Sequence, residues 1–290
     1  MPDNSASRVE ALKPRPGSYL SMWTPDLHYP FVDPKALGAL LLSLELLQPR
    51  EFGFLGDASD CHAWSSHPPK SKMEAAAHSF NEYEMKPLNR MIDMVEDNSE
   101  RQKFLEGNHE DRVERRLLEM GAVGKAIEDL VSPRILLTQD RKNLEYVPYQ
   151  RDPSAPIPHV KIADDYIATH GWSVSKHAAA KHLELAKGWS ILFGHVHRAQ
   201  VHCSREPITG RLLRAVCPGT MSLLQPLYLQ HNPSEWSHGF ELVWVTNDRK
   251  SWTSYTVMIR DGVCVLPGGL KIDGTSNRGR QLVNQVITGR

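Results

Sequence analysis

The sequence predicts an α/β (α+β) fold in which two mixed β-sheets pack together and helices flank them. In the first third of the chain, short apolar runs alternate with segments of helical periodicity, the pattern of strands joined by helices. From Ala199 onward, apolar runs of strand length follow one another. The two patterns together favour two packed sheets over a single one.

The regular structure is predicted to begin with a strand, a helix and a second strand. Residues 18–23 and 52–55 are apolar runs bounded by turn residues, so we expect buried strands there. Between them, leucines recur at helical spacing over 35–47, after Pro34 at the first helical turn and before Pro49. The unit is therefore strand, helix, strand.

The rest of the chain mixes loops, helices and short strands. The middle is predicted to contain a loop over 59–72, a helix over 73–95 interrupted at Pro87, a strand at 104–105, helices over 110–118 and 123–130, and a proline-rich loop over 148–158. The second half is predicted to contain strands at 160–162, 166–169, 189–193, 200–203, 212–216, 240–245, 252–259 and 263–266, and a helix over 176–186.

One folded domain is predicted over residues 18–267. Residues 1–17 are polar and contain prolines, and we expect a flexible N-terminal segment there. Residues 268–290 are polar and contain Gly, Asn and Arg, and we expect a flexible C-terminal tail. The chain of 290 residues exceeds the usual single-domain length, but one large α/β domain can absorb that length.

The charge balance and the cysteine pattern indicate which binding partners and which cellular compartment to expect. The 34 lysines and arginines balance 34 acidic residues, so no overall positive charge indicates binding to nucleic acid or to a membrane surface. A neutral chain can still have local positive patches. The four cysteines, at positions 61, 203, 217 and 264, form no CxxC pair, which favours a reducing, cytoplasmic compartment. Neither an N-terminal apolar segment nor a run of about 18 apolar residues occurs, so we expect no secretion and no membrane span.

Five short polar motifs each follow a predicted strand. In chain order they are Asp26-Leu27-His28, Gly56-Asp57-Ala58-Ser59-Asp60, Gly107-Asn108-His109-Glu110, His170-Gly171 and Gly194-His195-Val196-His197. Because strand ends converge at one edge of a sheet, these groups can meet. Two cations about 3.5 to 4 Å apart need one ligand that serves both. The carboxylate of Asp57 has the two oxygens for that role, while Asp26 and Asn108 offer oxygen donors that suit ions such as Mn²⁺.

The order of these motifs resembles the signature of the calcineurin-like metallophosphoesterase family, which reads DxH, GDxxD, GNH(D/E), H and GHxH. All five blocks are present between Asp26 and His197. The resemblance implies a four-layer α-β-β-α sandwich and a phosphate ester as substrate. Cys61-His62 stands where many phosphatases of the family carry Arg-Gly, which argues against protein phosphatase activity. The sequences around the first and fourth blocks look more like the small prokaryotic and phage-borne members.

The resemblance also implies a role for each matched side chain. Asp26, His28 and His197 would hold one divalent metal ion, Asn108, His170 and His195 would hold the other, and Asp57 would bridge them. The ions would be Mn²⁺, with Fe, Zn or Ni as alternatives, and a metal-activated hydroxide would attack phosphorus. His109 would lie outside the metal shell and protonate the leaving oxygen or stabilise the transition state. Asp60 would accept a hydrogen bond from its other nitrogen.

Three functions follow from this hypothesis. The first is hydrolysis of a phosphodiester in a nucleotide or nucleic acid, as in a nuclease or phosphodiesterase. The second is hydrolysis of a phosphomonoester in a phosphoprotein or a metabolite, because the same set of metal ligands serves both reactions. A catalytically silent binding scaffold is the third, and the seven filled ligand positions disfavour it.

Two features outside the motifs each allow a functional and a purely structural interpretation. Trp172 follows the fourth motif and could form a base-stacking surface, although core packing is the default for most tryptophans. Arg112, Arg115 and Arg116 follow the third motif on a predicted helix. We interpret the three arginines as a solvated helical face, with a phosphate clamp as the alternative.

Overall fold

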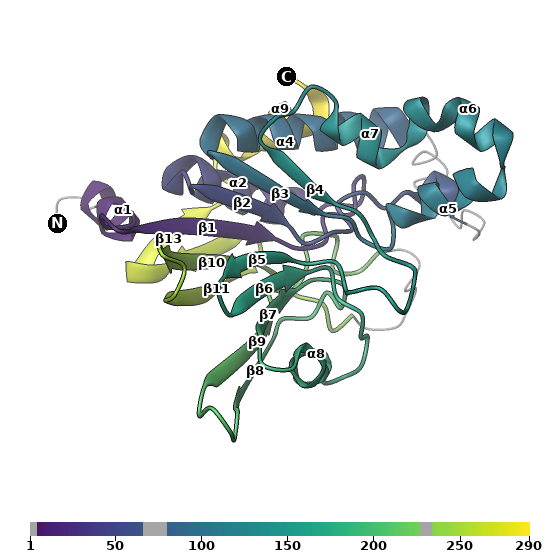
Figure 1. Ribbon diagram of the computed structural model, residues 1–290. Coiled ribbons are helices and arrows are strands. Elements are labelled where there is room, and N and C mark those ends of the chain that lie inside the picture. Colours follow the sequence, from purple (N-terminus) through teal and green to yellow (C-terminus); the bar gives the residue numbers. More distant parts are fainter. Residues whose placement is uncertain (1–4, 66–79, 227–233) are drawn as a thin grey trace.

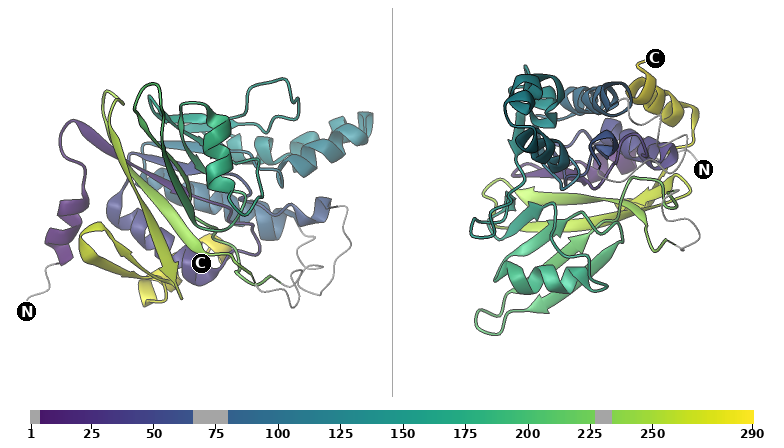
Figure 2. Two further views of the ribbon diagram at one scale, coloured as in Figure 1. Left: turned by 90° about the horizontal axis from the view of Figure 1, so that it is seen from below. Right: turned by 90° about the vertical axis from the view of Figure 1, so that its right-hand side faces the viewer.

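The computed structural model describes residues 5–65, 80–226 and 234–290. Within them the chain forms four layers, helix, sheet, sheet and helix, as predicted (Figure 1, Figure 2). Part of the predicted loop 59–72 and the start of the predicted helix 73–95 lie outside the described residues. None of the helices within the described ranges is long and apolar enough to span a bilayer.

An eight-stranded sheet forms one of the two inner layers. Its strand order is β13-β12-β11-β10-β1-β2-β3-β4. The strands are β1 (Ser18–Thr24), β2 (Glu51–Phe54), β3 (Arg101–Leu105), β4 (Leu144–Val147), β10 (His238–Thr246), β11 (Trp252–Arg260), β12 (Val263–Leu266) and β13 (Leu270–Asp273). β1 to β4 run parallel, and β10 to β13 extend the sheet from β1 in antiparallel order. The parallel half thus contains the predicted strand, helix, strand unit.

A five-stranded sheet packs against the first. Its order is β5-β6-β7-β9-β8. The strands are β5 (Val160–Ala163), β6 (Tyr166–Thr169), β7 (Ser190–Phe193), β8 (Gln200–Arg205) and β9 (Leu212–Cys217). β6 and β7 are parallel neighbours, so both end at the same edge of the sheet. The helix α8 (Ala178–Ala186) covers the outer face of this sheet (Figure 1, Figure 2).

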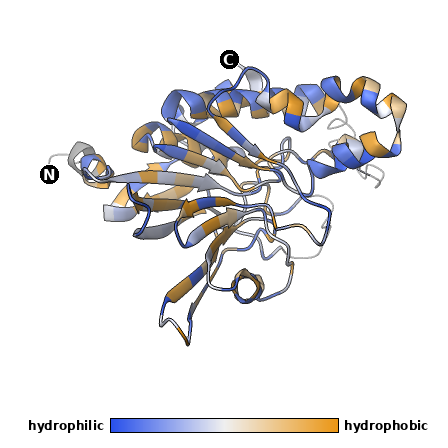
Figure 3. Ribbon diagram, in the orientation of Figure 1, coloured by the Kyte–Doolittle hydropathy of each residue, from blue (hydrophilic) through white to orange (hydrophobic). Residues whose placement is uncertain are grey.

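The remaining helices lie on the side of the eight-stranded sheet. They are α1 (Ser5–Leu12), α2 (Pro34–Leu47), the π-helical turn η2 (Asn81–Met85), α4 (Lys86–Asn98), α5 (Asp111–Glu119), α6 (Ala122–Val131), α7 (Pro133–Thr138) and α9 (Asn277–Thr288), with short 3₁₀ turns at η1 (His62–Trp64) and η4 (Pro267–Gly269). Asp33 caps α2 by accepting hydrogen bonds from the backbone nitrogens of Lys35 and Ala36. Pro87 is the second residue of α4, which directly follows the π-helical turn η2, and the helix continues past it. Hydrophilic and hydrophobic residues alternate along the outer helices, as expected for elements that bury one face (Figure 3).

Three apolar cores fill the spaces between the four layers. The largest lies between the helices and the eight-stranded sheet and includes Phe52 and Phe104. The second lies between the two sheets and includes Trp23 and Tyr166. The third lies under α8 and includes Phe193. Central strands such as β1 and β7 are buried on both faces, so they appear in the sequence as short, mainly apolar runs.

The C-terminal segment belongs to the fold, contrary to the flexible tail expected over 268–290. β13 is the edge strand of the eight-stranded sheet, and α9 packs against α2 and α4. Leu282, Val283 and Val286 of α9 are buried. The sequence of α9 is mainly polar, but its few apolar residues lie on one face of the helix, and this face is buried. The expected N-terminal segment 1–17 likewise contains a helix, α1, whose last residue accepts a hydrogen bond from the indole of Trp244 at 3.2 Å.

Candidate metal centre

The carboxyl ends of five strands from both sheets meet at one edge of the molecule. The predicted ligands follow these strands: Asp26 and His28 after β1, Asp57 after β2, Asn108 after β3, His170 after β6, and His195 and His197 after β7. All seven side chains therefore enter one cluster from two different sheets. Their contacts divide the cluster into two groups.

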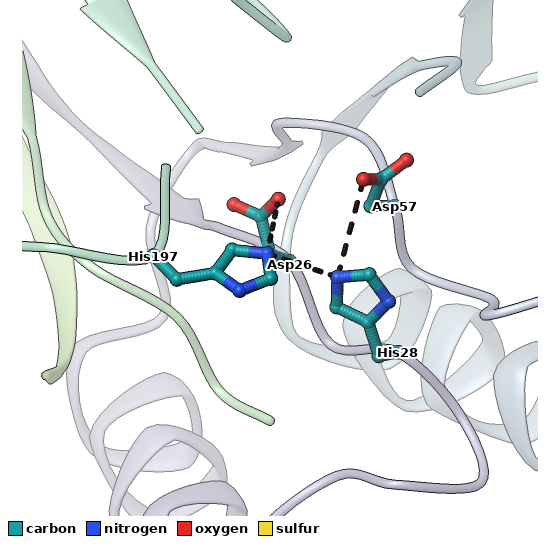
Figure 4. A group of neighbouring side chains, drawn as sticks. All are labelled: Asp26, His28, Asp57 and His197. Carbon is teal, nitrogen blue, oxygen red and sulfur yellow. Dashed lines mark hydrogen bonds and ion pairs between the residues drawn. The ribbon is translucent and has the colours of Figure 1, made fainter. Parts of the chain in front are cut away.

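The first group consists of Asp26, His28, Asp57 and His197, all of which are buried (Figure 4). His28 Nε2 lies 3.0 Å from His197 Nε2 and 3.9 Å from Asp57 Oδ2. His197 Nε2 lies 3.4 Å from Asp26 Oδ1. Atoms bound to one ion at about 2.1 Å lie roughly 3 to 3.4 Å apart when they are adjacent ligands and up to about 4.2 Å apart when the angle between them is wider. The group therefore fits a single divalent ion.

The second group consists of Asp57, His170 and His195, with Asn108 beside them. His170 Nε2 lies 3.3 Å from Asp57 Oδ2, 3.2 Å from His195 Nδ1 and 3.0 Å from Asn108 Oδ1. Asp57 is the member that both groups share. A carboxylate shared by two nitrogen-rich groups is the arrangement that a pair of neighbouring ions requires.

Most of the clustered side chains stand on left-handed backbone. The residues with positive φ are Asp26, His28, Asp57, His195 and His197, with values from 26° to 70°. For residues other than glycine this conformation is costly and persists where the surrounding structure imposes it, often at functional sites. Gly194 adds a close approach, because a Cβ there would lie 2.5 Å from Asp26 Oδ2. Both features indicate that the loops carrying this cluster adopt a strained, closely packed backbone.

Hydrogen bonds outside the cluster turn the imidazoles toward it. His28 Nδ1 lies 3.0 Å from Asp60 Oδ1, and His170 Nδ1 donates to the carbonyl of Leu55 at 2.7 Å. These bonds place the proton on Nδ1 and leave the Nε2 lone pair directed at the cluster. The backbone nitrogen of His195 donates to both carboxylate oxygens of Asp26, at 2.9 and 3.0 Å. This last contact joins the loops that follow β1 and β7.

His109 lies beside the cluster, next to Asp60 as the resemblance implied. Its Nδ1 is 3.1 Å from Asp60 Oδ1, and its Nε2 is 3.8 Å from Asp57 Oδ2. Asp60 therefore orients both His109 and His28. These three residues form another set of converging ligand atoms. The hydrogen bonds that Asp60 accepts from the two imidazoles account for that proximity without an ion.

The charges in the cluster separate the pKa values of its groups. Burial lowers the pKa of His109 and His170, but Asp57 together with Asp60 raises the pKa of His109 to about 9, and Asp57 together with Asp26 and the Leu55 carbonyl raises that of His170 to about 10. Burial and the neighbouring His170 lower the pKa of His195 to about 4. Burial raises the pKa of Asp57, but the surrounding histidines more than offset it and hold that pKa well below its usual range. The anionic Asp57 thus stabilises positive charge around it, the electrostatic condition for binding a cation.

Glu110 holds two of the motif loops together, a role that the sequence did not indicate. Its Oε2 accepts hydrogen bonds from the backbone nitrogens of Asp57 at 3.0 Å and Gly107 at 2.9 Å, and its Oε1 accepts from Ser59 N at 2.8 Å. The sequence feature that could have pointed to Glu110 is its position as the last residue of the third motif.

Arg112 contacts the site, whereas the sequence placed it on a solvated helical face. Its Nη1 donates to the carbonyl of Asp60 at 3.0 Å, and its Nη2 lies 3.0 Å from His109 Nε2. Arg115 and Arg116 are more exposed, with 55% and 41% of their side chains accessible. The spacing of three residues from His109, one helical turn, is the signal that could have separated Arg112 from the other two.

Trp172 lines a pocket of about 160 Å³ that borders His170. Its ring lies 4.3 Å from the imidazole of His182, and its backbone nitrogen donates to His182 Nε2 at 3.0 Å. Glu106 lines the same pocket, and burial raises the pKa of Glu106 to about 8. The tryptophan therefore belongs to the wall of the site, with one face packed on α8.

Comparisons with known proteins add context for the fold. No family model and no curated protein matches the chain. A single mutant of Vps29 from Entamoeba histolytica is similar at 14% identity and a TM-score of 0.40, over 88% of this chain and 98% of that chain. TT1561 of Thermus thermophilus is similar at 10% identity and a TM-score of 0.26, over 82% of this chain and 98% of that chain.

The class of the protein therefore follows from its own fold and site. Four layers, with five motifs gathered at the carboxyl ends of strands from both sheets, define a metallophosphoesterase-like fold. The buried His and Asp groups that share Asp57 form a candidate dinuclear metal site within it. The four-layer architecture is the one that the resemblance to calcineurin-like metallophosphoesterases implied.

Proposed function

We propose that this protein hydrolyses a phosphodiester in a nucleotide or nucleic acid, using two divalent metal ions. The observation that carries the proposal is the membership of Asp57 in both ligand groups. Asp26, His28 and His197 would hold one ion, Asn108, His170 and His195 would hold the other, and Asp57 would bridge them. The mixture of imidazole and oxygen donors favours Mn²⁺, with Fe, Zn or Ni as alternatives.

The chain's own residues supply the proton chemistry beside the ions. Bound cations would supply Lewis acidity, which lowers the pKa of water and neutralises charge on the phosphoryl oxygens. His109 holds a proton next to the cluster, oriented by Asp60, and would donate it to the leaving oxygen. Arg112 Nη2 lies 3.0 Å from His109 Nε2. Because a guanidinium N–H only donates, the neutral imidazole accepts this hydrogen bond at Nε2; once Nε2 carries a proton, it and Arg112 would be two neighbouring donors for an anionic oxygen.

The loop after the second motif supports a substrate other than a phosphoprotein. Cys61, at the position where many phosphatases of the family carry arginine, is fully buried. Its backbone nitrogen donates to Glu84 Oε2 at 2.6 Å, and its side chain faces Ser59. The position therefore offers no cation to a phosphoryl group.

The test is turnover of bis-p-nitrophenyl phosphate and p-nitrophenyl phosphate by the purified protein with Mn²⁺, together with elemental analysis. We expect about two metal ions per chain, faster turnover of the diester, no turnover in Asp57→Asn, and a smaller loss in His109→Ala, because p-nitrophenolate leaves with little protonation. Asp164→Asn, an exposed aspartate in the turn between β5 and β6, is the control.

Three results would change the proposal. Preference for the monoester would replace the diester with a phosphomonoester as the substrate class. Metal binding without turnover of either ester would favour a binding scaffold. Full activity in both variants would discard the mechanism.

A further inference from the structure

An arginine-lined cleft of about 630 Å³ opens beside the candidate metal centre. It shares Asn108 with the cluster, so a group in the cleft lies next to a group held at the cluster. Four arginines line it: Arg112, Arg115, Arg116 and Arg151. The first three come from α5 and the fourth from the proline-rich loop before β5. Segments far apart in the sequence thus supply one basic surface.

A buried carboxylate fixes two of these arginines in place. Asp111 is only 5% exposed; its Oδ1 accepts a hydrogen bond from Arg151 Nε at 2.7 Å, and its Oδ2 lies 3.4 Å from Arg115 Nε. One carboxylate cannot neutralise two guanidinium groups, so positive charge is left over. The fork of each guanidinium suits bidentate contact with phosphate oxygens.

The other two arginines add to the excess positive charge. Arg116 pairs with Glu119 at 2.6 Å. Arg112 contacts only a carbonyl and an imidazole at the site, and among the described residues it makes no ion pair. The lining therefore holds four cations against two carboxylates. Because the whole chain is neutral, this local field is the feature that would attract a polyanion.

Two aromatic rings line the same cleft. Tyr149 lies two residues before Arg151, and Trp64 is the last residue of η1, which follows the second motif. Aromatic faces interleaved with arginines suit a single-stranded nucleic acid, whose bases stack on the rings while its phosphates contact the cations. A duplex keeps its base faces covered by stacking, and a simple phosphate ester has no second phosphate to use.

We propose that this cleft binds the nucleotides adjoining the scissile phosphate of a single-stranded nucleic acid. Arg115, Arg116 and Arg151 contact the neighbouring phosphates, and Trp64 and Tyr149 stack on the bases. The inference rests on the proposed function for the position of the scissile phosphate. It extends that function by naming the substrate class and the residues that select it.

The test measures binding without hydrolysis, by the fluorescence anisotropy of a labelled eight-nucleotide oligothymidylate in EDTA. We expect Arg115→Ala/Arg116→Ala to raise Kd about tenfold and to reduce the slope of log Kd against log salt concentration by about one for each lost contact. Tyr149→Leu should weaken binding with the slope unchanged, because stacking releases no counterions. Circular dichroism of each variant checks that the fold is intact.

The matched control is Arg278→Ala/Arg280→Ala, which removes two arginines from α9, outside the lining of the cleft. We expect its Kd to stay within about twofold of the wild type. Equal effects of the cleft pair and the control pair would overturn the inference, as would tighter binding of a duplex than of a single strand. Turnover of bis-p-nitrophenyl phosphate without strand binding would discard the inference and retain the proposed reaction. Strand binding without turnover would retain the binding cleft and discard the proposed reaction.

Discussion

Glu110 Oε2 accepts a hydrogen bond from the backbone nitrogen of Asp57 at 3.0 Å. The same carboxylate accepts from Gly107 N and Ser59 N, at 2.9 and 2.8 Å. One buried side chain thereby joins the loops after β2 and β3, which carry the shared carboxylate and Asn108. Glu110 is a positioning residue, because it fixes the backbone of the cluster without offering an atom to either ligand group.

The substitution Glu110→Ala is expected to weaken both the fold and the cluster. Three backbone N–H groups would lose their acceptor, and each unsatisfied buried donor costs about 1 to 3 kcal/mol before any relaxation. Urea denaturation should show a loss of at least about 2 kcal/mol, and calorimetric titration should show weaker Mn²⁺ binding. Glu145→Ala, an exposed position on β4, is the control and should stay within about 0.5 kcal/mol. Equal stability of the two variants would contradict this role.

The ligand cluster was predictable because its residues follow apolar strands in a fixed order. Strand ends define an edge of a sheet, so the pattern predicted that motif residues such as Asp57 and His195 can meet there, and the family resemblance implied their roles as ligands. The pairing of the strands could not be read from the sequence, whereas the bridging role of Asp57 was implied by the resemblance, and the structure places Asp57 in both groups. The pairing of Asp60 with His109 came from the family resemblance, and the structure brings these two side chains together.

Other features were hidden because they depend on tertiary contacts. The arginine cleft needs the hydrogen bond between Arg151 and Asp111, which joins a proline-rich loop without periodicity to α5. The short strand β4 lies at the sheet edge with half-exposed residues and lacks a strong apolar run. α9 appeared polar because only its buried face is apolar. In each case, composition reports the average of an element, whereas packing depends on one of its faces.

His109→Ala is expected to slow hydrolysis most for esters with poor leaving groups. A general acid contributes roughly 10²- to 10⁴-fold when the leaving oxygen needs a proton. The p-nitrophenolate group needs little protonation, so the loss should shrink along a series of aryl diesters with increasingly acidic phenols. The measurement is kcat/KM across that series. Metal content should match the wild type, because hydrogen bonds to Asp60 explain the position of His109. A uniform loss across the series, or the loss of one metal ion, would contradict the assignment.

The C-terminal helix is expected to contribute to global stability. Leu282 is 4% exposed and belongs to the largest core cluster. Leu282→Ala should lower the free energy of unfolding by about 2 to 5 kcal/mol, through lost burial and the cavity left behind. Asn284→Ala, on the exposed face of the same helix, should change it by no more than about 0.5 kcal/mol. If both variants unfold at the wild-type urea concentration, α9 does not belong to the cooperative unit.

The stability of the protein is expected to fall with rising pH through a carboxyl buried between the two sheets. Glu241 lies 3.9 Å from Arg214 Nη2, and burial raises the pKa of Glu241 from 4.5 to about 7. The folded state therefore binds the proton more tightly than the unfolded state. This stabilisation is fully present below pH 4.5 and is lost as the pH rises to about 7.

Glu241→Gln cannot ionise, so its stability relative to the wild type should increase across that interval, by up to about 3 kcal/mol. Urea denaturation of both proteins at several pH values measures this difference, and subtracting the two curves removes the contribution of the other acidic groups. A difference that stays constant from pH 4.5 to 7.5, or one that decreases, would show that Glu241 is ionised in the folded protein throughout. Its burial would then have to be compensated by Arg214, the cation that reaches it from β9.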